Sequence, residues 1–224
     1  FSAPNPETDR DWTVELQFGA YTPRIDSQFQ TSQNSTSPPF QEAFGTSSSF
    51  SIQLGAERHV FQKFGTVSIG GSLGYWSLEG KAVAADNNAS SEATDSTEFV
   101  VYPLQLQGTY RLDKWVDIVP LVPMVRAGLR YYYWRILDGA GDVRQFSQGK
   151  EAQGGTMGWH ASKGLHLCLD FLDGEMAADF ERDAGVFNSY LTIEYRYSRI
   201  DDFGSDDSFR MGDDTVLIGL AMDL

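Results

Sequence analysis

The stretch that decides the fold is Val119–Tyr133, VPLVPMVRAGLRYYY, in which two kinds of side chain alternate. Every second residue from Val119 onward is apolar or aromatic, whereas Arg126 and Arg130 fall on the intervening positions. Successive side chains of a β-strand point to opposite faces, so this period of two predicts a strand with one apolar face.

Seven further runs on either side of this stretch alternate in the same way. They cover residues 12–20, 50–57, 67–76, 100–111, 165–171, 187–197 and 215–224. Helical periodicity is nearly absent, and residues 175–182 alone indicate a short helical piece. We therefore expect an all-β fold with eight antiparallel strands.

The composition narrows the class of protein. The 224 residues include 31 Asp and Glu against 17 Lys and Arg, a net charge of −14, which disfavours a general nucleic-acid binder because phosphate contacts need a basic surface. The single cysteine, Cys168, excludes an internal disulfide and a multi-cysteine metal site. No apolar run reaches the roughly 18 residues of a transmembrane helix. The polar start, Phe1–Glu7, shows no signal peptide, and we expect one to have been removed.

The connections between the runs differ in length in a regular order. Long polar stretches span residues 22–47, 79–97, 138–156 and 201–214, and shorter ones span 58–65, 112–114 and 173–184. A meander sends alternate connections to opposite ends, so the long ones gather at one end. This asymmetry is typical of outer-membrane barrels, whose external loops are long and whose periplasmic turns are short.

The aromatic residues form a third pattern, because they gather near the two ends of the runs. Amphipathic rings prefer the two membrane–water interfaces, so we expect two aromatic girdles around an apolar belt. The predicted girdle residues near the short turns are Trp12, Tyr110, Trp115 and Phe171, and those near the long loops are Tyr21, Trp76, Tyr102, Tyr131, Tyr133, Trp134, Trp159, Tyr195 and Tyr197.

Charges of both signs occur on the polar face. The alternation alone fits both a soluble barrel, with its apolar face inward, and a membrane barrel, with its polar face inward; the aromatic bands favour the membrane. Charges in a closed lumen must be paired and hydrogen-bonded, so we expect an ion-paired, plugged interior. The predicted lumen network is Glu15, Glu57, Asp170 and Glu194 with Arg111, Arg126, Arg130 and Arg196.

In strand pattern, loop asymmetry and a last strand, Leu217–Leu224, at the end of the chain, the sequence resembles the small eight-stranded outer-membrane barrels of Gram-negative bacteria, of the OmpA-transmembrane-domain and OmpX type. The resemblance covers about residues 11–224. It implies a transmembrane up-and-down β-barrel in the bacterial outer membrane, with long extracellular loops, short periplasmic turns and a periplasmic extension over residues 1–10. Such barrels usually end in an aromatic residue, whereas this chain ends in Leu224.

The function expected for such a barrel is a structural or interaction scaffold without enzymatic activity, cofactor or metal. Its partners would be outer-membrane lipid and lipopolysaccharide, and a protein bound through the long loops. The alternative is a narrow pore or a small-ligand carrier. An eight-stranded barrel has an interior just wide enough for side chains to fill, which favours a plug over a pore.

Two motifs could carry other chemistry. His160-Ala161-Ser162 resembles the His-x-Ser of outer-membrane lipid A deacylases, but the nearest acid, Glu175, falls in the turn at the wrong end, so a lipid A hydrolase is the less favoured alternative. The Asp-rich stretch 201–214 could hold calcium, although its spacing does not fit an EF-hand and a solvated acidic loop is the simpler interpretation.

The longest connection, residues 22–47, is predicted to be ordered. Structureless loops of more than about 12–15 residues are uncommon and tend to be functional or disordered. This one contains apolar anchors that a disordered linker would lack, and we expect them to hold it against other loops or a partner protein. The anchors are Phe29, Pro38, Pro39, Phe40 and Phe44.

Overall fold

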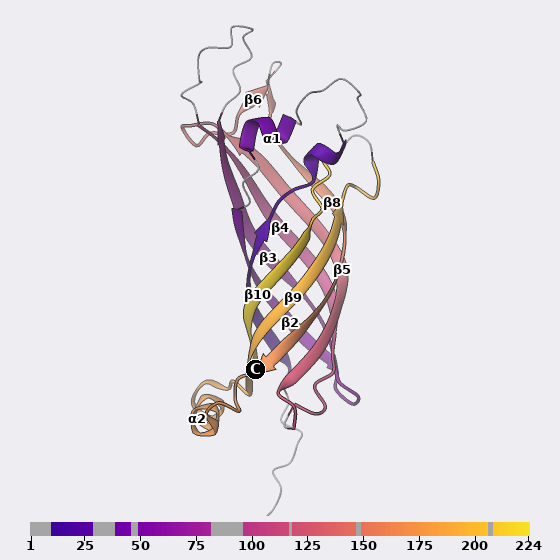
Figure 1. Ribbon diagram of the computed structural model, residues 1–224, viewed down its shortest axis with the longest axis vertical. Helices are drawn as coiled ribbons and strands as arrows, with labels where there is room; N and C mark the ends of the chain where they lie inside the picture. Colours follow the sequence, from indigo (N-terminus) through magenta and orange to yellow (C-terminus); the bar gives the residue numbers. More distant parts are fainter. Residues whose placement is uncertain are drawn as a thin grey trace, which may run out of the picture.

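The computed structural model describes residues 10–28, 39–45, 49–81, 96–116, 118–146, 149–205 and 208–224. Eight antiparallel strands close into a barrel in the order β1-β10-β9-β8-β5-β4-β3-β2 (Figure 1). These strands are β1 (Trp12–Tyr21), β2 (Ser49–Phe61), β3 (Thr66–Lys81), β4 (Ser96–Arg111), β5 (Leu121–Leu137), β8 (Gln153–Cys168), β9 (Asn188–Ile200) and β10 (Asp214–Asp223). The all-β, eight-stranded prediction is confirmed.

Shorter elements lie in the connections. A two-stranded hairpin, β6 (Gln145–Phe146) and β7 (Lys150–Glu151), lies between β5 and β8. The 3-10 helix η1 (Ile25–Gln28) and helix α1 (Pro39–Phe44) lie between β1 and β2.

Helix α2 (Gly174–Ala184) joins β8 to β9 and confirms the helical piece predicted over residues 175–182. Asp173 caps its first turn by accepting from two backbone N–H groups, and Gly185 ends it in the left-handed conformation, at φ 68°. In the described part of the chain, no helix is long and apolar enough to cross a membrane.

The connections fall at two distinct ends of the barrel (Figure 1). We call the end with the connections after β1, β3, β5 and β9 the long-loop end, and the other the short-turn end. The first and last described residues meet at the short-turn end, where Asp11 N donates to Leu224 O at 2.9 Å. The predicted extension over residues 1–10 lies outside the described residues except for Arg10.

The sixth strand of the barrel was predicted with the wrong bounds, over residues 165–171. β8 begins at Gln153, well before the predicted start at Leu165, and it ends at Cys168, so Phe171 lies in the following turn. Glycines such as Gly154 and Gly158 occupy its first half and hide the apolar alternation, although pairing with β5 and β9 makes it a strand.

Burial alternates along most of each strand, with a break at Phe99–Val101 of β4, and shows which face is inside. In β10, for example, buried and exposed residues alternate without a break. Exposed positions carry large apolar side chains, among them Leu54, Leu73, Leu106 and Ile218, while carboxylates, amides and guanidiniums are buried. This arrangement is the reverse of a soluble barrel, whose apolar side chains face inward.

Candidate functional site

Arg126 of β5 is the centre of the ion-paired part of the lumen. Its buried guanidinium contacts three carboxylates from three other strands. The contacts are Nη2 to Glu15 Oε2 at 2.8 Å, Nη1 to Glu194 Oε2 at 2.7 Å and Nε to Glu57 Oε1 at 3.3 Å. A single cation therefore ties together β1, β2, β5 and β9 across the barrel.

Arg196 of β9 extends this cluster toward the long-loop end. Its Nη2 lies 2.7 Å from Glu194 Oε1, and its Nη1 donates to Gln53 Oε1 at 2.7 Å. Gln17 completes the arrangement: its amide oxygen accepts from Arg196 at 2.8 Å, and its amide nitrogen donates to Glu15 and Glu194, each at 2.9 Å. Each buried charge thus has several polar partners, which offsets the cost of removing it from water.

A second charged cluster closes the short-turn end. Arg111 of β4 donates from Nη1 and Nη2 to the two carboxylate oxygens of Asp223, each at 3.0 Å. Asp223 also accepts from Thr13 at 2.7 Å and Tyr190 at 3.2 Å, and His59 lies 2.7 Å from the Thr13 hydroxyl. Asp223 is not a member of the predicted network, although its parity in the last strand places it on the polar face.

Two residues of the predicted network are placed differently from the rest. Asp170 follows the end of β8, where its carboxylate accepts from Asn188 Nδ2 at 2.8 Å and Ser189 N at 3.1 Å; the prediction that it lies in the lumen network is wrong, because the strand ends before it. Arg130 is buried, but no carboxylate among the described residues pairs with it. Its guanidinium lies 5.0 Å from the Tyr132 ring and reaches Gln53 at 3.5 Å.

The His160–Ser162 motif also faces the lumen, where both side chains are buried. Neither of them, nor His166, has a hydrogen-bond partner within the described residues, so no Ser–His pair is formed. Glu175 lies in α2, beyond the short-turn end of β8. The residues of the deacylase-like motif are therefore not brought together.

Near the long-loop end the interior changes from polar to apolar. The ring of Tyr21 packs edge-on against Trp76 at 5.0 Å, and Phe99 packs against the same Trp76 at 5.8 Å. We call this cluster the apolar plug; its buried members are Tyr21, Ile25, Trp76, Leu78, Phe99, Val101, Tyr132, Ile200 and Met211. The placement of Tyr21, Trp76 and Trp134 in the girdle is wrong: all three lie on the inward-facing positions of their strands.

The first connection folds over the apolar plug. Phe40 and Phe44 of α1 pack against Phe99, with ring centroids 5.8 and 5.9 Å apart. Asp26 in η1 accepts from the backbone N–H groups of Phe40 and of the next residue, at 2.8 and 3.0 Å, and fixes the start of α1. Phe29 and Pro38 lie outside the described residues.

The other predicted girdle residues lie in outward-facing positions or in turns. Tyr102 stacks with Tyr133 at 6.2 Å, and Trp159 packs against Tyr197 at 5.5 Å. The remaining members, all exposed, are Trp12, Tyr110, Trp115, Tyr131, Phe171 and Tyr195.

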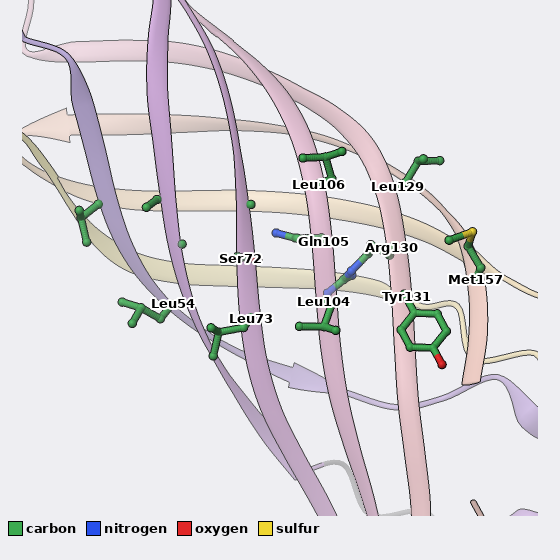
Figure 2. Close-up of a pocket in the computed structure, with 14 residues that line it drawn as sticks. Leu54, Ser72, Leu73, Leu104, Gln105, Leu106, Leu129, Arg130, Tyr131 and Met157 are labelled. Atoms are coloured by element: carbon green, nitrogen blue, oxygen red, sulfur yellow. The ribbon is translucent and has the colours of Figure 1, made fainter. Parts of the chain in front are cut away.

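The outer wall between these rings is apolar and gently hollowed. A shallow groove of about 660 Å³ runs across β2, β3, β4 and β5. Figure 2 shows Leu104 and Leu106 on one side of β4 and Gln105 on the other, so the polar side chain turns to the lumen. Lys163 of β8 is an exception to the apolar character of this wall, because it faces outward in register with Val125 and Tyr195.

A polar pocket of about 270 Å³ lies at the long-loop end above Tyr197. Arg24, Arg199 and Arg210 line it; Arg24 pairs with Asp214, and Arg199 Nε lies 2.7 Å from Asp201 Oδ2.

The acidic stretch 201–214 does not gather its carboxylates around one point in the described residues. Asp202 accepts from Met157 N at 2.7 Å, and Asp213 bonds to Ser198 of β9. Within the part of the chain that is described, no group of three metal-ligating side chains occurs; Asp206 and Asp207 lie outside that part.

The chain was compared with protein-family models, curated proteins and solved structures. No protein-family model matches the chain, and no curated protein matches it in sequence. The crystal structure of Neisserial surface protein A is similar over 96% of this chain and 97% of that chain, with 12% identity and a TM-score of 0.53. The fold is that of a small outer-membrane β-barrel. The predicted resemblance to such barrels is thereby confirmed at the level of the fold.

Two further solved structures have lower TM-scores. Ail of Yersinia pestis in complex with the heparin analogue sucrose octasulfate is 8% identical over 96% of this chain and 97% of that one, with a TM-score of 0.44. The N-terminal barrel domain of Pseudomonas aeruginosa OprF is 12% identical over 95% and 97%, with a TM-score of 0.39.

Proposed function

We propose that the protein spans the bacterial outer membrane as a closed, non-enzymatic barrel that serves as a scaffold for contacts at its long-loop end. The observation that carries this proposal is the reversed wall: large apolar side chains are exposed on the outside while Arg126 and its three carboxylates are buried inside. Water would not favour such an exterior, whereas a bilayer would. The scaffold would work without catalytic residues, cofactor or metal.

Membrane insertion is tested by heat-modifiable migration. Purified protein in a mild denaturing detergent should migrate faster unheated than after boiling, because a membrane barrel stays folded until it is heated. Identical migration under both conditions, with no protease-resistant core in lipid vesicles, would overturn the membrane assignment.

The barrel should conduct no ions. The arginine–carboxylate cluster fills the half of the lumen near the short-turn end, and the apolar plug fills the half near the long-loop end. In planar lipid bilayers we expect no stepwise conductance from the folded protein. Stable single-channel steps would instead favour the alternative of a narrow pore.

The polar pocket above Tyr197 supports lipopolysaccharide as a lipid partner. Arg24 and Arg199 line it just beyond an outward-facing aromatic ring, where the phosphates of lipid A would lie in an outer leaflet. Guanidinium groups recognise phosphate bidentately. Binding of lipid A should fall for the variant Arg24→Gln/Arg199→Gln and for dephosphorylated lipid A, but not for the control Arg182→Gln on α2. Unchanged binding in the double variant would refute this site.

A protein partner would be bound through the four long connections, 22–47, 79–97, 138–156 and 201–214. Support comes from the first of these, because Phe40 and Phe44 pack it onto the barrel mouth as a defined surface. Deleting residues 27–46 should leave the barrel heat-modifiable and abolish co-purification of the partner. If every partner still co-purified after the deletion, residues 22–47 would only cover the barrel mouth and would not bind a partner.

A further inference from the structure

Helix α2 has an apolar face that no part of the described protein covers. None of its residues is buried, and Met176 and Phe180, one turn apart, are 55% and 47% exposed. Arg182 lies on the opposite face and pairs with Asp179 and Asp183, which border the apolar face. Figure 1 shows α2 beside the foot of the barrel, outside its wall. A capped helix with an exposed apolar face can lie at a membrane interface, although the polar residues of α2 are mainly acidic and not basic as is usual for such helices.

A groove of about 360 Å³ separates α2 from the barrel. Met176 and Phe180 line one side of it, and Leu220 and Met222 of β10 line the other. Leu220 and Met222 are outward-facing and exposed, so the groove opens onto the apolar outer wall. Whatever covers that wall also has access to the groove.

The charge around the groove restricts its occupant. Asp170 and Asp173 line it near the start of α2, and neither forms an ion pair within the described residues. The helix itself adds Glu175, Asp179, Glu181 and Asp183 against Arg182. An anionic headgroup would be repelled there, whereas an ammonium group would be attracted.

We infer that this groove holds an acyl chain of a phospholipid with an ammonium headgroup, such as phosphatidylethanolamine, from the leaflet at the short-turn end. The apolar face of α2 and the outer face of β10 would enclose the chain, and Asp170 and Asp173 would receive the headgroup. The inference rests on the proposed membrane insertion, because it extends the lipid-contacting wall onto α2.

Spin-label accessibility in phosphatidylethanolamine-containing vesicles tests the position of α2. In a Cys168→Ala background that is still heat-modifiable, labels are placed by Phe180→Cys on the apolar face, Arg182→Cys on the polar face and Leu106→Cys on the outer wall. The measured quantity is the rate of collision with oxygen divided by that with a water-soluble nickel reagent. We expect this ratio to be several-fold higher for the label at 180 than for the label at 182, and to equal the ratio at 106. If the labels at 180 and 182 both collide mainly with the nickel reagent while the label at 106 collides mainly with oxygen, the inference is overturned and membrane insertion stands. If the label at 106 collides mainly with the nickel reagent, the proposed insertion itself is overturned.

The headgroup is tested by native mass spectrometry of protein extracted from vesicles with equal phosphatidylethanolamine and phosphatidylglycerol. The wild type should retain the ethanolamine lipid several-fold over the glycerol lipid. The variant Asp170→Asn/Asp173→Asn should lose this preference, since Asn removes both charges while its one acceptor oxygen keeps the helix cap at 173 and one of the two bonds at 170. Glu181→Gln, on α2 but not among the residues that line the groove, should keep it. Equal retention of both lipids by the wild type overturns the headgroup assignment.

Discussion

The two halves of one lumen are closed by opposite chemistry. Toward the short-turn end, Arg126 and Arg196 are held by carboxylates and amides, whereas toward the long-loop end Trp76 and Phe99 pack as in the core of a soluble domain. Where the outer face must meet lipid, the alternation of a strand leaves polar groups inside, and their charges must pair. Where the outer face meets water, the interior can be apolar. In the proposed membrane orientation, the strands would therefore leave the bilayer near Arg130 and Tyr132 of β5, where the interior chemistry changes.

The largest loss of stability is expected from disrupting the ion pairs in the charged half of the lumen. Arg126→Met leaves three buried carboxylates without their shared cation, and removing one partner of a buried ion pair costs about 3–5 kcal/mol. Urea unfolding in lipid vesicles, followed by tryptophan fluorescence, should show this loss. A loss below about 1 kcal/mol would mean that the cluster is hydrated and adds little to stability.

A charge on the outer wall should cause the next largest loss of stability, and this loss should depend on the position of the charge along the barrel axis. Leu106→Arg places a cation on the exposed face of the belt and should cost about 2–4 kcal/mol. Phe50→Arg, near the long-loop end of β2, is the matched control and should cost about 0–1 kcal/mol, since such penalties fall near the interface. Equal costs at the two positions would contradict the assigned height of the belt.

The apolar half should tolerate substitution better than the charged half. Phe99→Leu keeps an apolar side chain in the apolar plug and should cost less than the roughly 3–5 kcal/mol typical of truncating a buried Phe to Ala. The same urea titration, run beside Arg126→Met, measures the difference. A larger loss for Phe99→Leu would place the principal stabilisation at the mouth of the barrel.

The smallest expected effect is a gain in the stability of the barrel. Lys163 faces outward from β8, and its long stem can carry the ammonium toward a more polar zone, which lowers its cost. Replacing it by Leu should stabilise the barrel by about 1 kcal/mol, measured as a higher temperature for loss of the fast-migrating form on gels. Destabilisation would indicate that Lys163 has an anionic partner in the membrane.

The sequence predicted the strands and their faces far better than the partners in the lumen. Alternation assigned Arg126, Glu194 and Leu106 to the correct faces because parity is a local property of a strand. The aromatic bands wrongly assigned Trp76 to the girdle, because they reflect the height of a residue along the barrel and not the face of the strand on which it lies. The pairing of Arg111 with Asp223, 112 residues apart, depends on how the barrel closes, and no local pattern encodes it.

Pairing between β1 and β10 sets the order in which the fold can form. The first strand has an open edge until the last one arrives, with seven residues of each in register from Thr13–Asp223 to Gly19–Leu217. Exposed strand edges are prone to pair with other chains, so the unfinished sheet needs protection during biogenesis. Thr13 of β1 donates to Asp223 across this seam, and Arg111 of β4 pairs with the same carboxylate across the lumen, so that closure and burial of the last charge coincide. Contacts between distant parts of a chain slow folding, and the wall should therefore become complete in a single late step.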